Sequence, residues 1–200
     1  MELTVTTMMS LDGVTQSPGA PEEDPSGGFD LGGWAMPYFE EQARAFVGGI
    51  FDRADAFLLG RKTYEIFASY WPLQGEEDPI AAALNSRPKH VASSTLDDLA
   101  WDGATLLGGD LTEAVAALKR EPGRELQVHG SIELTQALLA AGLVDRHYLE
   151  VLPIALRGGR GLFDGAVPAT KFRVEESRTT PTGVQLLTLV PDGEVVQGHF

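Results

Sequence analysis

The stretch ADAFLLGRKTYEIFASYW, residues 54–71, changes its pattern at Gly60. Before the glycine, the apolar run Ala56-Phe57-Leu58-Leu59 has the length of a strand and predicts a buried strand over residues 55–59. After it, apolar residues recur at helical spacing and predict a helix from about residue 62. This junction therefore places a glycine, two cations and a hydroxyl at the end of a strand: Gly60, Arg61, Lys62 and Thr63.

The rest of the chain continues the alternation of strands and helices. Further strands are predicted over 3–9, 89–93, 104–107, 125–129 and 147–154, and helices over 36–51, after Asp78-Pro79, from Asp110 and over 131–141. Residues 171–179 and 184–190, joined across Pro181-Thr182-Gly183, are typical of a hairpin. We therefore expect a single α/β domain over residues 1–200. Its fold would be a three-layer α/β/α arrangement, with a mostly parallel central sheet and a C-terminal antiparallel hairpin.

The segment from Thr15 to Gly33 follows the first predicted strand and is rich in glycine and proline. Such a composition disfavours regular structure. Long irregular segments in compact domains are commonly lids or binding loops, so we expect this one to act as a lid.

Composition excludes several classes of protein. Fifteen Lys and Arg residues against 29 Asp and Glu residues give a formal net charge of −14, which disfavours nucleic acid and anionic membranes as partners. The chain has no cysteine and no long apolar run, and its start does not resemble a secretory signal, so we expect a cytoplasmic protein. The histidines His90, His129, His147 and His199 lack metal-ligand spacing, so we expect no metal site.

Two other strand ends resemble the junction at Gly60. Ser93, Ser94 and Thr95 follow one strand, and Gly130 and Ser131 follow another. In a parallel sheet these ends meet at one edge, where helix N-termini favour anions. Hydroxyls are also common in turns and helix caps, which is the structural alternative for each place. Together, the three junctions favour an extended anionic ligand.

A set of motifs in a fixed order makes the resemblance to a known family specific. The motifs are Ser10-Leu11-Asp12-Gly13, Leu59 to Glu65, Trp71, Val91 to Leu96, Gln127 to Ser131, Gly142 to Asp145, Pro153 to Leu156 and Gly159 to Phe163. In this order they resemble the dihydrofolate reductase superfamily. The branch they resemble is built like the C-terminal reductase domain of bacterial riboflavin biosynthesis.

The resemblance implies a reductase that uses NADPH. The family's pyrophosphate-binding junction corresponds to Gly60, Arg61, Lys62 and Thr63, and its site for the adenosine 2′-phosphate to Ser93, Ser94 and Thr95. The turn beneath the cofactor corresponds to Gly130, Ser131 and Ile132, and the loop over nicotinamide and substrate to residues 12–34.

The expected substrate site contains departures from the family. Trp34 aligns with the family's loop tryptophan, which puts Phe39 where pterin reducers carry a carboxylate, with Glu40 one residue later. Trp34 and Phe39 are therefore our substrate-binding candidates. Asp12 and Glu40 are the catalytic candidates, although Asp12-Gly13 also suits an ordinary turn.

The predicted function is hydride transfer from NADPH to a small heterocycle, either a pteridine or an aminopyrimidine. The alternative is a nucleotide-binding module of the same fold that has lost catalysis. We also predict a homodimer, because the last strands carry many apolar residues that an edge of the sheet would expose: Leu149, Val151, Leu152, Leu186, Leu187 and Leu189.

Overall fold

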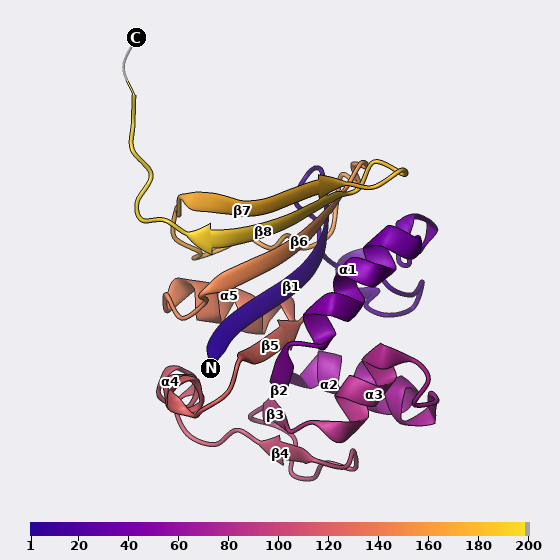
Figure 1. Cartoon of the computed structure of the whole chain (residues 1–200), viewed down its shortest axis with the longest axis vertical. Helices are drawn as coiled ribbons and strands as arrows, with labels where there is room; N and C mark the ends of the chain where they lie inside the picture. The colour runs from indigo at the N-terminus through magenta and orange to yellow at the C-terminus, as the bar shows by residue number, and fades with distance from the viewer. Residues whose placement is uncertain (199–200) are drawn as a thin grey trace.

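This computed structural model describes residues 1–198, and its strands form one mixed sheet. The parallel strands are β1 (Glu2–Ser10), β2 (Ala54–Gly60), β3 (Lys89–Ala92), β4 (Ala104–Leu106), β5 (Glu125–His129) and β6 (Arg146–Leu152). The antiparallel strands β7 (Phe172–Thr179) and β8 (Gln185–Pro191) extend it, giving the order β4-β3-β2-β5-β1-β6-β8-β7 (Figure 1). The predicted mostly parallel sheet with a C-terminal hairpin is confirmed.

Helices cover both faces of this sheet (Figure 1). One face carries α1 (Glu41–Phe51), α2 (Arg61–Tyr70) and α3 (Pro79–Ser86), and the other carries α4 (Leu111–Arg120) and α5 (Ile132–Ala140). Short 3₁₀ turns are η1 (Ser26–Gly28), η2 (Met36–Tyr38) and η3 (Trp71–Leu73). Within residues 1–198, no helix has the length and apolar character needed to cross a membrane.

Alternation along the strands divides their side chains between two faces, which we name the α1 face and the α5 face. On β1, Leu3 and Val5 pack into the core beneath α4 and α5, whereas Met8 packs beneath α1. Because β6 pairs with β1 in register, Tyr148 and Glu150 share the α1 face and His147 lies on the α5 face.

The predicted helix over residues 36–51 is wrong at its start. Pro37 lies in η2, Phe39 then leaves helical geometry (ψ 63°), and Glu40 is extended (ψ −179°), so that α1 begins only at Glu41. The apolar spacing runs across this break because Phe39 still packs into the same core as Val47. The break matters because it sets the direction of Phe39 and Glu40.

The apolar side chains of the last strands are covered within the chain. Leu149, Leu152, Leu186 and Leu189 are all buried, and Val151 and Leu187 are half-buried. Leu162, from the segment after β6, covers Leu149 and Leu189, while Trp34 and Val14 cover Leu152 and Leu186. The prediction of an exposed apolar edge here is therefore wrong, and the homodimer stays a prediction without that support.

His147 is a buried histidine in an apolar part of the α5 face. It has no exposed surface and lies edge-on to Phe172, with ring centroids 5.1 Å apart. Neither ring nitrogen has a hydrogen-bond partner among residues 1–198. Burial lowers the pKa of His147 to about 4, since charging the ring here would leave an unpaired ion.

We expect the free energy of unfolding of His147→Phe to fall less than that of the wild type as pH is lowered. The pKa of this residue is lower in the folded state than in the unfolded chain, so unfolding takes up a proton as pH falls from 6.5 to 4. Between pH 6.5 and 4, His147 should lower the free energy of unfolding of the wild type by about 3 kcal/mol. Urea unfolding followed by circular dichroism at several pH values measures it. His129 titrates in both proteins and does not distinguish them. If the free energy of unfolding falls equally with pH in both, the low pKa of His147 is contradicted.

Candidate functional site

The loops that follow β2 and β5 meet at the carboxyl edge of the sheet. The N–H of Gly60 donates to Oγ of Ser131 (2.9 Å), and that hydroxyl donates to Oγ1 of Thr63 (2.7 Å). A Cβ on Gly60 would lie 3.1 Å from the same Oγ, so a glycine is what allows this close approach. The structure thus brings together four of the predicted cofactor residues: Gly60, Thr63, Gly130 and Ser131.

Both loops lead directly into helices. Gly130 (φ 63°) and Ser131 (φ 57°) are both left-handed, and they turn the chain so that α5 begins at Ile132. Neither N-cap residue, Gly60 for α2 or Ser131 for α5, caps its first turn with its side chain. The N–H groups of both first turns are therefore available at the edge, where the helix dipole favours a negative charge.

Two cations lie on the first turn of α2. The side chains of Arg61 and Lys62 are 47% and 51% exposed. Arg61 lies 4.0 Å from Glu65, and Lys62 lies 3.7 Å from Asp24 in the loop after β1. Exposed pairs at such distances contribute little, so both cations can turn toward a phosphate.

Asp24 joins that loop to a third cation, Arg160, in the segment after β6. Its carboxylate contacts Arg160 as well as Lys62, and Arg160 also pairs with Glu133 on α5 (3.0 Å). Burial alone would raise the pKa of Asp24, but hydrogen bonds from Ser26 and the two cations outweigh it and lower the pKa. The edge thus carries a charge cluster that the sequence did not suggest.

The hydroxyl cluster after β3 lies beside the Gly60 junction. Ala92, the last residue of β3, is in register with Gly60 of β2. Oγ of Ser93 accepts from the N–H groups of Thr95 (3.2 Å) and Leu96 (3.1 Å), which forms a turn. Ser94 and Thr95 are exposed at this edge. Phosphate binding by the three stays a prediction.

Asp12 has a structural role in this structure. Its carboxylate accepts from Oγ of Ser10 (2.6 Å) and from the N–H groups of Arg157 (2.7 Å) and Leu156 (3.1 Å). The bond from Ser10, followed by those from Arg157 and Leu156, lowers the pKa of Asp12 to about 2. Asp12 therefore fastens the segment after β6 to the end of β1, and its predicted catalytic role stays a prediction.

The loop over residues 15–33 is irregular but well anchored. Nε2 of the buried Gln16 donates to the carbonyls of Asp24 (2.8 Å) and Ser26 (2.9 Å), and Nε1 of Trp34 donates to the Gln16 carbonyl (2.8 Å). Trp34 packs with Leu152 in the core rather than facing solvent. Its predicted contact with substrate, like the movement of the lid, stays a prediction.

A narrow pocket lies on the α1 face, near the carboxyl ends of β1 and β6, and in this structure it is too tight to admit a water molecule. It is lined by Met8, Ala35, Tyr38, Phe39, Glu150, Leu152 and Val184. Phe39, predicted to contact substrate, is thus part of a pocket. A ligand could enter this pocket only after lining side chains such as Phe39 move aside.

Three polar side-chain atoms in this region are buried and, among residues 1–198, have no hydrogen-bond partner. They are Oε1 of Glu150, Oγ1 of Thr6 on β1 and Oε1 of Glu40, the residue that precedes α1. Buried polar groups are normally paired, so these atoms stand out, and of the three residues Glu150 lines the pocket. Glu40, a predicted catalytic residue, belongs to this group.

Glu150 is the site residue that the sequence did not reveal. Its side chain is 2% exposed, and burial raises the pKa of its carboxyl to about 8. The available signal was a lone acidic residue within the otherwise apolar run Tyr148 to Leu152. The strand pattern did not tell which face of β6 would be covered by the segment before α1.

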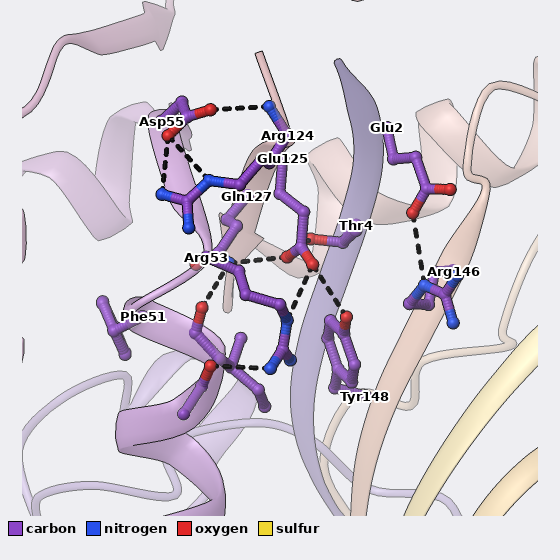
Figure 2. A network of polar contacts seen from close by, with 12 residues as sticks. Glu2, Thr4, Phe51, Arg53, Asp55, Arg124, Glu125, Gln127, Arg146 and Tyr148 are labelled. Atoms are coloured by element: carbon purple, nitrogen blue, oxygen red, sulfur yellow. Dashed lines mark hydrogen bonds and ion pairs between the residues drawn. The ribbon is translucent and has the colours of Figure 1, made fainter.

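Glu125, a second buried glutamate on the α1 face, is fully engaged. Figure 2 shows its carboxylate accepting from Nε of Arg53 (2.9 Å), Nε2 of Gln127 (2.7 Å), the Tyr148 hydroxyl (3.0 Å) and the Thr4 hydroxyl (3.3 Å). Arg53 also donates to the Gly49 carbonyl (2.7 Å). These contacts fix the C-terminal end of α1 on the sheet.

A wider groove of about 530 Å³ borders this network at the opposite end of the α1 face. The arginines that line it are already paired with carboxylates: Arg53 with Glu125, Arg146 with Glu2 and Glu175, and Arg178 with Glu176. The cations at the carboxyl edge are paired in the same way, so ion pairing does not distinguish the two places. Among residues 1–198, no group of three or more acidic or histidine side chains is placed to hold a metal ion, and His199 lies outside the described residues.

Replacing each of the two buried glutamates by glutamine should change the free energy of unfolding in opposite directions. We expect Glu150→Gln to raise the free energy of unfolding at pH 8 by about 2–4 kcal/mol, because the wild-type carboxyl ionises only on unfolding between pH 4.5 and 8. Below pH 4.5 the gain should disappear. We expect Glu125→Gln to destabilise by about 1–3 kcal/mol, since Arg53 loses its carboxylate. Urea unfolding at pH 4 and pH 8 measures both, and a loss of stability in Glu150→Gln at pH 8 would contradict a neutral, unpaired Glu150.

Two proteins of Bacillus subtilis (strain 168) have related sequences. One, YyaP, is 26% identical over 136 residues, which cover 66% of this chain and 72% of that protein. The other, YwjB, is 24% identical over 148 residues, which cover 74% of this chain and 80% of that protein. Neither name states an activity.

Solved structures share the fold. A putative riboflavin biosynthesis protein from Shewanella sp. PV-4 superposes with a TM-score of 0.68 at 22% identity, covering 96% of this chain and all of that chain. A pyrimidine reductase-like protein from Corynebacterium diphtheriae gives a TM-score of 0.64 at 14% identity, covering 96% of this chain and 92% of that one. The model of the RibD C-terminal domain matches residues 2–186, so the chain belongs to the RibD C-terminal domain family.

Proposed function

We propose that this protein is an NADPH-dependent reductase that transfers hydride to a small, flat heterocycle, either a pteridine or an aminopyrimidine. The observation that carries the proposal is the contact of the two glycine junctions through Gly60, Ser131 and Thr63 at the carboxyl edge. Membership of the RibD C-terminal domain family supports it, and so does the fold shared with a pyrimidine reductase-like protein.

The residues at the edge fit a dinucleotide. The first turns of α2 and α5 would hold the pyrophosphate through N–H groups, with Arg61 and Lys62 supplying charge. Ser93, Ser94 and Thr95 would receive the 2′-phosphate. Gly130 turns the chain beneath the ligand with φ 63°, a conformation that glycine adopts without strain.

The pocket on the α1 face would hold the substrate beside this edge, once Tyr38 and Phe39 move to open it. When bound, the reduced nicotinamide supplies the hydride. Phe39 and Tyr38 would offer flat apolar surfaces to a ring, and Glu40, the next residue in the chain, has an unpaired buried oxygen. Asp12 and Glu40 stay candidates for orienting the substrate. The homodimer also stays part of the proposal.

A nucleotide-binding module without catalysis is the competing function. Purified protein would be assayed for oxidation of NADPH at 340 nm with lumazine, 5-aminouracil and related pteridines and pyrimidines. We expect turnover with at least one of these rings. Tight binding of NADPH with no turnover across the panel would favour the module instead.

A prediction about Arg61 follows from its place on α2. A charge-assisted hydrogen bond contributes about 1.5–3 kcal/mol, so Arg61→Ala should weaken NADPH binding about 10- to 100-fold. NADH binding should hardly change if Arg61 faces the 2′-phosphate, whereas both cofactors should bind more weakly if it faces the pyrophosphate. Calorimetric titration at fixed salt distinguishes the cases. Glu65→Ala, which removes the other member of the pair, is the control, and unchanged binding of both cofactors to Arg61→Ala would exclude a phosphate role.

A further inference from the structure

Glu150 occupies an unusual place for an acidic side chain. It lies in the middle of a sheet strand, is 2% exposed, and forms part of the wall of the α1-face pocket. The opposite part of the wall comes from Tyr38 and Phe39, which precede α1. The carboxyl is thus covered from solvent, and it lines the closed pocket that would have to open for the substrate.

Within residues 1–198, the elements around Glu150 offer it no counter-ion. On β1 and β8 its register partners are Met8 and Leu186, and the neighbours on this face of those strands are Thr6 and Thr188. From the segment before α1, Tyr38 lines the same pocket and Glu40 lies two residues later.

The nearby charged and titratable groups already have other contacts. Arg53 pairs with Glu125 on this face, and Tyr148, two residues before Glu150 on β6, donates its hydroxyl to Glu125. Arg44 of α1 lies over the ring of Phe39, 5.0 Å from its centroid. Burial is accordingly the cause that raises the pKa of Glu150. A carboxyl in such a place keeps its proton near neutral pH, as it would have to ionise without a partner.

We infer that Glu150 is the acid of this pocket: its carboxyl donates a hydrogen bond to an acceptor nitrogen or oxygen of a flat heterocycle and supplies the proton that reduction requires. The inference rests on the proposed reductase function and names the group that would complete the reaction. It also narrows the substrate class to uncharged rings with a C=N acceptor, because a ring already protonated at that nitrogen has no acceptor to offer.

The proton transfer balances the hydride transfer. The carbon of a C=N bond gains the hydride, with its electron pair, from the reduced dinucleotide. The π electron pair of the bond moves to nitrogen, and nitrogen takes the proton from the carboxyl of Glu150. The carboxylate left behind recovers a proton from solvent when the product leaves. Proton donation by a positioned acid typically contributes 10²–10⁴-fold to a rate.

The first test detects the protonated carboxyl of Glu150 directly and needs no catalytic activity. Infrared spectroscopy of wild-type protein at pH 7 should show the C=O stretch of a protonated carboxyl that is missing in Glu150→Gln and retained in Glu125→Gln. Adding lumazine, whose ring contains C=N bonds, should shift this band, because the carboxyl then donates to the ring. A wild-type spectrum without the band, or a band that lumazine does not shift, would overturn the inference.

The second test separates catalysis from binding. For a ring that the wild type reduces, Glu150→Gln should lower kcat about 100-fold or more and change KM less than about threefold, since the amide still donates a hydrogen bond but holds no acidic proton. The kcat of the wild type should fall as pH rises past about 8. An unchanged kcat in the variant would overturn the role of Glu150 while leaving the reductase function intact. A wild type that reduces no ring but whose carboxyl band shifts with lumazine would support the hydrogen bond from Glu150 and contradict the reductase function.

Discussion

The position of α1 depends on one buried carboxylate, that of Glu125. It accepts hydrogen bonds from Arg53 beyond the end of α1, Thr4 on β1, Gln127 on β5 and Tyr148 on β6 (Figure 2). Gln127 in turn donates to the Ile50 carbonyl (2.7 Å), which ties the last turn of the helix to the centre of the sheet. Because α1 is fixed at this end, the segment that precedes it must lie over the carboxyl ends of β1 and β6. That segment carries Phe39 and Glu40, so the pocket is shaped by a network at the far end of the helix.

Glu150 lies on the same face of the sheet as Glu125 and is just as well buried, but its surroundings differ. Glu125 has partners for both oxygens, so the price of burying its charge is offset by four donors, one of which is the cation Arg53. Glu150 has an oxygen with no such partner within residues 1–198, and it opposes folding at neutral pH. A leucine at this position would pack better. Groups that break the rules of packing in this way are typical of functional sites, and this contrast is what singles out Glu150.

The sequence predicted those parts of the molecule that depend on local pattern. The alternation of apolar runs gave the strands, and the glycines at residues 60 and 130 marked the junctions, since each lies where a strand passes into a helix. Contacts between distant segments could not be predicted from the local pattern. Asp12 binds Leu156 and Arg157, and Asp24 binds Arg160, each across more than a hundred residues. The apolar side chains of β6 and β8 looked exposed because strand periodicity does not tell what covers each face. Leu162 and Trp34, both from irregular segments, cover them.

The charges at the carboxyl edge show how an acidic protein can present a site for an anion. With a net charge of −14, the chain has few cations to spare, and near the junction each of three is held by a carboxylate: Arg61 by Glu65, and Lys62 and Arg160 by Asp24. Partly exposed pairs of this kind contribute only about 0–1 kcal/mol, so a phosphate can replace the carboxylates at small cost. Such an exchange at Lys62 would break the contact that joins Asp24 to α2, while Arg160 would still hold Asp24. Anion binding at Lys62 would therefore be coupled to this loop through that one contact. The coupling follows from the small number of cations. A chain with more of them could bind phosphate with cations that hold no loop in place.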